Sequence, residues 1–190
     1  MKKRQLVIHY NAPVVLSFSM IALIVLGLDF LTGGATTMKY FCVYRSSFSD
    51  PLTYLRLFTH VLGHADYAHY ISNIMLMLVI GTTLEDKYGS KKLMFCILIT
   101  ALVSGLVQVF FFPSTALLGA SGIVFMMIVL SSLSGMKSGS VPLTLILVVI
   151  LYLGGELWDA ITIRDSVSQL THIVGGLCGA AMGYLMLGKR

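Results

Sequence analysis

The sequence predicts an all-α membrane protein, a compact bundle of six transmembrane helices forming a single domain over residues 1–190. Hydrophobic residues make up 57% of the chain and charged residues only 11%, whereas soluble domains carry roughly 25% charged residues. A chain this apolar cannot cover its own surface in water, which excludes a soluble globular domain and a disordered chain. The apolar residues also fall into long runs, close to the roughly 20 residues that cross a bilayer.

The apolar runs give six predicted spans, with approximate bounds 14–31, 68–84, 92–112, 119–135, 141–158 and 168–187. The first run has features of a secretory signal peptide, because basic residues precede it and small residues follow it. We favour a retained span instead. Polar residues through Asn11 separate the basic residues from the apolar run, and an even number of spans requires it.

The basic residues predict that both termini face the cytoplasm. With the N-terminus inside, nine of the thirteen Lys and Arg residues fall on the inner side of the membrane, as the positive-inside rule requires. The outer four are Lys39, Arg45, Arg56 and Arg164. The net charge of +5 does not indicate a nucleic-acid partner, because the basic residues stand singly or in short clusters beside apolar runs.

The first outer loop, at about 32–67, is long and rich in aromatic residues, which favour the boundary between membrane and water. Ser49-Asp50-Pro51 is typical of a helix start, with a capping side chain before a proline at the first helical position. We therefore expect a short helix lying in the outer interface. An ordinary ordered loop is the alternative.

Strongly polar side chains occur inside three of the predicted spans, where they are costly unless they face a cavity or a partner. They are His69 and Asn73 in the second span, Ser121 in the fourth and His172 in the sixth. In the predicted orientation these three spans all run from outside to inside, and each polar residue lies near the start of its span. We therefore expect all four side chains to share one depth near the outer surface.

The local sequence gives these polar groups contexts that suit chemistry. His69 and Asn73 are four residues apart, so they project from one face of their helix. Ser121 stands at a helix start between Gly119 and Gly122, where glycine permits close approach and free backbone N–H groups can stabilise an oxyanion. Taken alone, such a serine usually bonds its own backbone, and small residues often serve packing only.

A glycine stripe follows His172 along the sixth span, at Gly175, Gly179 and Gly183. Small residues at steps of four let two helices touch backbone to backbone. If the fourth span is the partner, His172 comes within hydrogen-bonding distance of Ser121. The joint occurrence of these groups at one depth on three parallel helices favours a functional site over a purely structural explanation.

At these residues the chain resembles the rhomboid family of intramembrane serine proteases, over about residues 50–187. Four motifs carry the resemblance: His64-x4-His69-x3-Asn73, Gly81-x3-Glu85, Gly119-Ala120-Ser121-Gly122 and His172-x2-Gly175-x3-Gly179. Two positions depart from the family pattern. Leu55-Arg56 stands where the family usually has Trp-Arg, and Phe125 stands where it usually has a tyrosine packed on the histidine.

The resemblance implies a Ser–His dyad, with Ser121 as the nucleophile and His172 as the general base and acid. It also implies an oxyanion site formed by the Ser121 backbone N–H, Asn73 and His69, with Phe125 packing on the imidazole. Supporting glycines would be Gly119, Gly122, Gly175 and Gly179. No carboxylate stands at that depth on the three polar spans, so no third member is expected, and neither a cofactor nor a metal is implied.

By resemblance, the expected partners are single-span membrane protein substrates and the lipid bilayer, with 141–158 as the lateral gate. A bacterial cytoplasmic (inner) membrane is the expected location, and the oligomeric state is left open. One alternative is a rhomboid-like binding protein that does not cleave its clients, although such relatives usually lack the serine or the histidine. The other is a small transporter, although residues 1–95 and 96–190 show no repeat. The three cysteines (Cys42, Cys96 and Cys178) show no disulfide or metal spacing.

Overall fold

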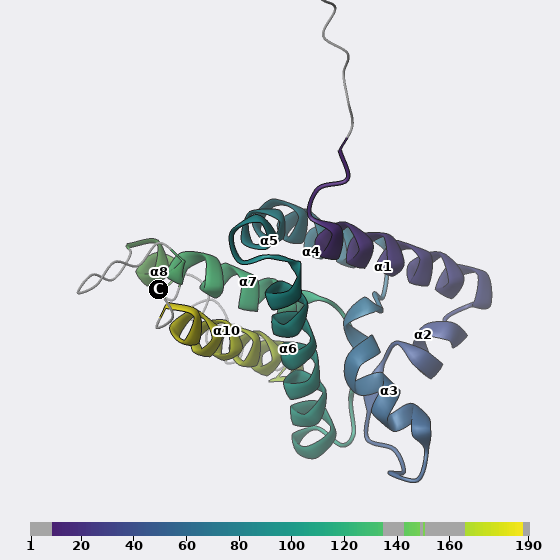
Figure 1. Cartoon of the computed structure of the whole chain (residues 1–190). Coiled ribbons are helices and arrows are strands. Elements are labelled where there is room, and N and C mark those ends of the chain that lie inside the picture. The colour runs from purple at the N-terminus through teal and green to yellow at the C-terminus, as the bar shows by residue number, and fades with distance from the viewer. Residues whose placement is uncertain (1–8, 135–142, 149, 151–165, 188–190) are drawn as a thin grey trace, which may run out of the picture.

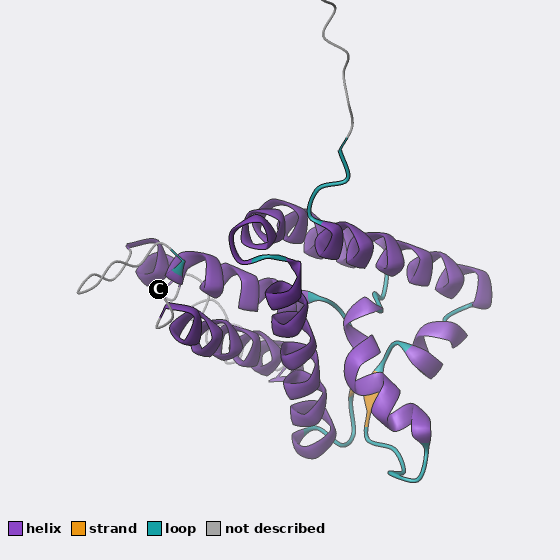
Figure 2. Cartoon of the chain, viewed as in Figure 1, coloured by secondary structure: helices purple, strands orange, loops and turns teal. Residues whose placement is uncertain are grey.

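The computed structural model describes residues 9–134, 143–148, 150 and 166–187, and these are mostly helical (Figure 2). Within them, three helices are long and apolar enough to cross a membrane, at Pro13–Thr32, Tyr67–Tyr88 and Ser90–Phe111. Two shorter apolar stretches are Ser121–Leu133 and Leu170–Met186. The chain is thus an integral membrane protein. Most of the predicted fifth span, 141–158, lies outside the described residues, so the count of six spans stays a prediction.

The first span is α1 (Pro13–Thr32), which begins at a proline and ends before Gly33 in the left-handed conformation. The start of α1 is capped from another helix. The Glu85 carboxylate accepts the N–H groups of Val14 at 2.9 Å and Val15 at 3.0 Å. Because these N–H groups have no partner within their own helix, the carboxylate ties α1 to the second span.

The second span is one continuous helix made of α4 (Tyr67–Leu76), a π-helical turn η2 (Met77–Gly81) and α5 (Thr82–Tyr88). Its first turn is capped by Asp66, whose Oδ1 accepts the N–H of His69 at 2.7 Å. A methyl group added to Gly81 would lie 2.9 Å from a Val15 side-chain carbon and 3.1 Å from the Met127 sulfur. The glycine therefore lets the second span pack closely against both α1 and α7.

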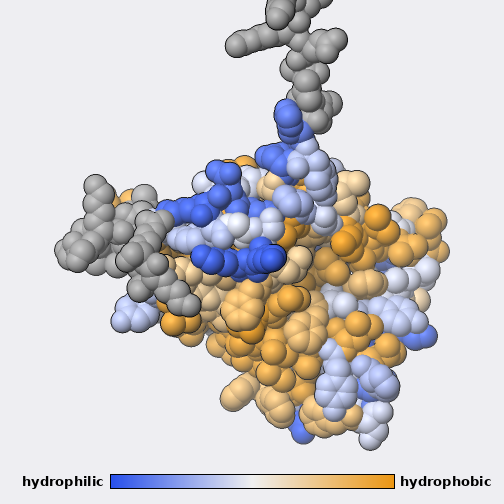
Figure 3. Space-filling model, in the orientation of Figure 1, coloured by the Kyte–Doolittle hydropathy of each residue, from blue (hydrophilic) through white to orange (hydrophobic). Residues whose placement is uncertain are grey.

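The third span, α6 (Ser90–Phe111), stands between the outer-loop helices and the α7–α10 pair (Figure 1). Its Gly105 packs against the backbone of Leu57, 3.0 Å from where a side chain would begin. Lys87, Lys91 and Lys92 are exposed where α5 ends and α6 begins. Figure 3 shows hydrophilic side chains gathered around the start of the described chain and apolar ones over much of the remaining face.

The outer loop contains α2 (Ala35–Tyr40), α3 (Pro51–Thr59) and a 3-10 turn η1 (His60–Leu62). A helix does begin at Pro51, as the sequence predicts, and the Asp50 side chain accepts the Leu52 N–H at 3.0 Å. Its position in the membrane interface stays a prediction. The sequence did not predict a strand pair, β1 (Val43–Tyr44) with β2 (Ala116–Leu117), which is antiparallel and joins the outer loop to the segment before Ser121.

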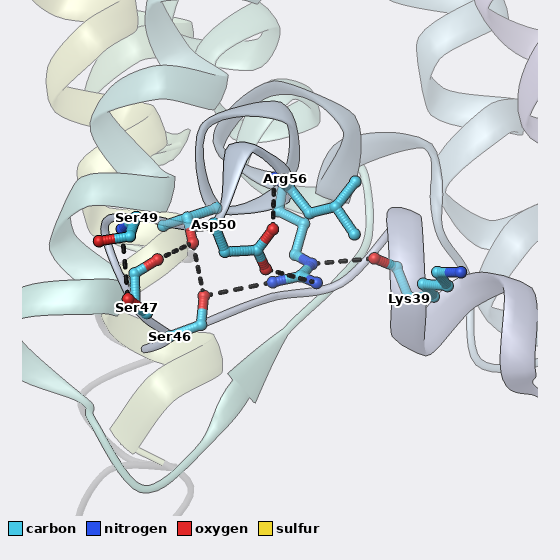
Figure 4. A network of polar contacts seen from close by, with 8 residues as sticks. Lys39, Ser46, Ser47, Ser49, Asp50 and Arg56 are labelled. Carbon is cyan, nitrogen blue, oxygen red and sulfur yellow. Dashed lines mark hydrogen bonds and ion pairs between the residues drawn. The ribbon is translucent and has the colours of Figure 1, made fainter.

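Arg56 holds the outer loop together from a buried position, only 4% exposed. Its Nε donates to the Lys39 carbonyl at 2.9 Å, and its other nitrogens reach Ser46 Oγ at 3.2 Å and the Asp50 carboxylate at 3.6 Å (Figure 4). The guanidinium also lies over the Tyr44 ring, 4.5 Å from its centroid. These contacts join α2, the loop after β1 and α3.

The two helices that carry Ser121 and His172 pack closely together. They are α7 (Ser121–Leu133) and α10 (Ser166–Leu187), and α8 (Leu143–Val148) lies between them in sequence. Side chains added at Gly175 and Gly179 would overlap the backbone carbonyls of Gly122 and Met126 respectively. The glycine stripe of α10 therefore does face the fourth span, which was an assumption of the sequence analysis.

Candidate active site

Ser121 is the first residue of α7, and the two residues before it, Gly119 and Ala120, are buried. Gly119 has a φ of 117°, which is unfavourable for residues with a side chain. Its N–H donates to the His60 carbonyl at 3.0 Å. The predicted fourth span begins at residue 119, whereas the corresponding helix α7 begins at Ser121. The difference arises because Gly119 does not have helical dihedrals. Ser121 is half-buried at the start of α7, so its hydroxyl and its N–H lie at the first turn of this helix.

His172 lies about two turns into α10 and is held beside the first turns of α7. Its imidazole stacks on Phe125, with ring centroids 4.2 Å apart and planes 4° from parallel. Phe125 is one helical turn after Ser121. The preceding residue of α10, Thr171, contacts Gly122, and its methyl carbon would lie 3.1 Å from a side chain there. The structure therefore brings His172 and Ser121 to the same end of two packed helices.

His69 lies on the other side of the serine loop, against Gly119. The position of a methyl group on Gly119 is 2.8 Å from both Cε1 and Nε2 of the imidazole. The Ala65 N–H points to His69 Nδ1 at 3.5 Å, which makes Nδ1 the acceptor nitrogen of the neutral ring. The proton is then on Nε2, the nitrogen beside the serine loop.

Asn73 is buried one turn after His69 on α4. Its Nδ2 donates one hydrogen bond to the His69 carbonyl at 2.9 Å, which directs the amide group toward the start of the helix. An amide nitrogen carries two hydrogens, so a second N–H is left for another acceptor. The structure thus places both second-span residues at the helix start, with His69 in contact with the serine loop.

Two further histidines surround this loop and are kept neutral by burial. Burial lowers the pKa of His60 to about 4, and the same effect together with the neighbouring His69 lowers the pKa of His64 to about 4. The His64 ring packs edge-on against His69 at 5.1 Å and against Tyr70 at 5.5 Å. His64 therefore supports the position of His69 as an uncharged ring.

Some residues that shape the site were missed by the sequence analysis. The His60 carbonyl anchors Gly119, yet no pattern identifies a backbone acceptor. Ser104 and Gln108 are buried on α6, and a side chain added at Gly122 would lie 3.5 Å from Ser104 Oγ. A signal for this pair was present, because polar residues at a spacing of four inside an apolar run share one helix face.

The site suits acid–base and nucleophilic chemistry. The Ser121 hydroxyl stands at the start of α7, and the His172 imidazole is fixed beside that helix. The His69 imidazole presents an N–H to the loop that precedes Ser121. No group of three or more His, Cys, Asp or Glu side chains that could hold a metal ion occurs among the residues whose placement is described.

Comparisons with known proteins agree with the sequence pattern. The Rhomboid domain family model matches residues 51–189. Rhomboid protease GlpG of Pectobacterium atrosepticum is 26% identical over 176 residues, covering 90% of this chain and 62% of that protein. Rhomboid-related protein 2 of Mus musculus is 27% identical, covering 71% of this chain and 51% of that protein. Rhomboid protease GluP of Bacillus subtilis is 26% identical, covering 95% of this chain and 37% of that protein. The chain thus spans between about a third and three-fifths of the length of these relatives.

Proposed function

The chain belongs to the rhomboid family, and from this membership we propose that it is an intramembrane serine endopeptidase. Its substrates are single-span membrane proteins, which it cleaves near the outer face of the bilayer. Its location in this proposal is a bacterial cytoplasmic (inner) membrane. The support for this location is that several relatives named rhomboid protease GlpG come from bacteria. It uses neither a metal nor a cofactor.

In the proposed reaction Ser121 and His172 act as a dyad. Neutral His172 removes the proton from Ser121 Oγ while the oxygen attacks the peptide carbonyl, and the imidazole then protonates the leaving amine. A water molecule next gives one proton to His172 while its oxygen attacks the acyl carbon. The ester bond to Ser121 Oγ then breaks, His172 returns the proton to Oγ, and the carboxylic acid product leaves. The observation that carries this proposal is the stack of His172 on Phe125, one turn from the serine on a helix packed against α10.

The negative charge that develops on the carbonyl oxygen is stabilised by three donors in this proposal. They are the backbone N–H of Ser121, the Nε2–H of His69 and the free N–H of Asn73. The close approach of His69 Nε2 to Gly119 supports this arrangement. Removing one such donor typically costs about 10²–10³ in rate, so Asn73→Ala slows the reaction without abolishing it.

In this proposal packing orients the imidazole of His172. Parallel stacking on Phe125 fixes the plane of the ring, and the contact of Gly175 with the Gly122 carbonyl fixes the height of α10 along α7. A dyad held by packing is one of the known variants of the serine triad. The proposed lateral gate, 141–158, lies mostly outside the described residues.

The test is cleavage of a single-span membrane protein by the purified full chain in liposomes. We expect Ser121→Ala and His172→Ala each to lower the rate by on the order of 10⁴-fold or more, because members of a nucleophile–base unit fail together. Ser131→Ala, on the same helix and half-buried, is the matched control and keeps full activity. A fluorophosphonate probe should label the native protein at Ser121 only.

Cleavage that persists in Ser121→Ala would refute the proposal. If the native chain binds the single-span protein without cutting it and does not react with the probe, the chain is a non-proteolytic binding protein of the same family.

A further inference from the structure

A groove that the proposed reaction does not use lies between the last turns of α1 and the start of α4. It has a volume of about 570 Å³. Its walls are mainly apolar and come from Leu23, Leu26 and Phe30 on α1. In the orientation predicted from the lysines, this groove lies at the outer side of the membrane, and Leu23 and Phe30 on its wall are exposed.

Gly27, in the second half of α1, also lines the groove. A methyl group added there would meet no atom within 4 Å, so no neighbouring helix requires a glycine at this position. A glycine inside a helix is less favourable than alanine by about 0.5–1 kcal/mol, and it exposes the backbone of α1 to whatever occupies the groove. Because Gly27 has no side chain, it leaves additional space along the apolar wall of the groove.

Two carboxylates from separate parts of the chain line the same groove, Asp29 on the last turn of α1 and Asp66 at the start of α4. Each uses one oxygen within the protein, since Asp29 Oδ1 accepts the Thr37 N–H at 3.0 Å and Asp66 Oδ1 accepts the His69 N–H at 2.7 Å. Neither forms an ion pair with any residue in the described part of the chain. Each can accept further hydrogen bonds.

We propose that this groove binds a phospholipid with an ethanolamine headgroup. One acyl chain lies along the apolar wall over Gly27, and the ammonium group lies between Asp29 and Asp66. A primary ammonium offers a positive charge and three N–H donors, which matches two carboxylates with free acceptor positions. A choline headgroup has the charge but no N–H donor, and an anionic glycerol headgroup is repelled by both carboxylates.

The test measures which lipids stay bound to the purified full chain. The protein is released for native mass spectrometry from vesicles of dioleoyl-phosphatidylethanolamine and dioleoyl-phosphatidylglycerol in equal amounts. We expect the ethanolamine lipid to be retained about fivefold more than the glycerol lipid, in line with two partly exposed charge-assisted contacts. A second mixture, with dioleoyl-phosphatidylcholine in place of the glycerol lipid, should also favour ethanolamine.

Three variants separate the headgroup and acyl-chain contributions. The double variant Asp29→Asn with Asp66→Asn keeps both capping oxygens and should abolish the preference. Gly27→Leu adds a side chain at a position where a Cβ meets no atom within 4 Å, and it should lower retention of every lipid. Asp86→Asn, an exposed carboxylate on α5, is the matched control and should change nothing. Thermal unfolding of each variant, within about 2 °C of the native protein, verifies that it is folded.

Equal retention of ethanolamine and glycerol lipids, or a preference that survives the double variant, would overturn the proposal. Retention of choline lipid equal to that of ethanolamine lipid would overturn the assignment of the headgroup. Each of these results concerns lipid retention and not cleavage, so the lipid proposal can fail while the proposed proteolysis stands. Cleavage by the double variant is not part of this test, because Asp66 caps α4 at His69, a proposed oxyanion donor.

Discussion

The ring of Phe125 stacks on His172, and in the proposed dyad this packing performs the task that a carboxylate performs in a serine triad. The stack needs a flat ring of this size and no hydroxyl group, so phenylalanine serves in the place where the family usually has tyrosine. We expect Phe125→Tyr to stay within about twofold of the native rate. Phe125→Ala should lower kcat by about 10²-fold, the cost typical of a misplaced catalytic group, with a smaller effect on KM.

The split between kcat and KM distinguishes positioning from general destabilisation. Phe125→Ala should lower kcat with little change in KM, and Phe125→Tyr should leave both close to the native values. Phe95→Ala, which removes a ring exposed on α6, is the matched control. Equal loss of kcat in Phe95→Ala and Phe125→Ala would show that the stack has no special role.

Buried His60 makes the stability of the outer loop dependent on pH. Its pKa is lowered to about 4 by burial, while an unfolded histidine has a pKa of about 6.5. Between these values the unfolded chain binds a proton that the folded chain excludes, so stability is complete above about pH 6.5 and is lost as the pH falls toward 4. We expect thermal unfolding in detergent to occur at a lower temperature at pH 5 than at pH 7.

The variant His60→Asn keeps an N–H donor for the Arg56 carbonyl, which His60 Nδ1 reaches at 3.0 Å, and cannot titrate. It should reduce the acid destabilisation without removing it, because His64 contributes through the same effect. His9→Asn, at an exposed position, should leave the pH dependence unchanged. An unfolding temperature equally sensitive to pH in His60→Asn and the native chain would contradict this assignment.

At the scale of elements, the contact between α7 and α10 depends on single missing side chains. A methyl group at Gly175 would overlap the Gly122 carbonyl, whereas one at Gly176 would make an ordinary 3.7 Å contact with Val129. We expect Gly175→Ala to destabilise the protein by about 1–3 kcal/mol, typical of overpacking, and to lower proteolysis strongly by moving His172. Gly176→Ala should be neutral in both assays. Similar behaviour of the two variants would contradict the observed packing.

The second span fastens α1 to the rest of the protein through Glu85. Its two carboxylate oxygens accept two N–H groups of the first turn of α1, and Glu85 is only 4% exposed. We expect Glu85→Ala to lower the free energy of unfolding by about 1–3 kcal/mol, the cost of buried donors left unpaired. Glu85→Gln keeps one acceptor and should cost less. Asp86→Ala, beside it and exposed, is the control, and an equal effect there would exclude the cap.

The long apolar helices could be predicted from the sequence because each depends on a long apolar run. The observed α1 and α6 differ from the predicted spans by one or two residues at each end. The start of α3 was predictable from the Asp50-Pro51 pair, since a cap and a proline act locally. The strand pair of Val43–Tyr44 with Ala116–Leu117 was not, because two residues per strand show no periodicity and their partners are far apart in sequence.

The candidate site was predictable in composition but not in its supporting contacts. Polar side chains are costly in a membrane, so the joint occurrence of Ser121, His69 and His172 at one depth indicates a site. Their fixed positions depend on backbone atoms, such as the His60 carbonyl that binds Gly119, and a carbonyl has no sequence signature. The same reason explains why the Glu85 cap of α1 could not be derived from its motif.

For the molecule as a whole, the proposed chemistry depends on which side of the membrane holds the starts of α4 and α7. The exposed lysines at the α5–α6 turn lie at the other end of the second span from His69, so the positive-inside rule predicts that the site is at the outer side. Exposed Ser49, in the outer loop, and exposed Lys91, at the start of α6, mark the two sides.

Single cysteines at these two positions test the orientation. The described structure leaves Cys42 and Cys96 buried and Cys178 half-buried, which keeps the background low. In intact bacterial cells, a maleimide that cannot cross membranes should label Ser49→Cys and leave Lys91→Cys unlabelled until the cells are permeabilised. The opposite result would place Ser121 at the cytoplasmic side, where it would have to cleave substrates near their inner ends. The orientation proposed for cleavage and for the lipid groove would then both be wrong.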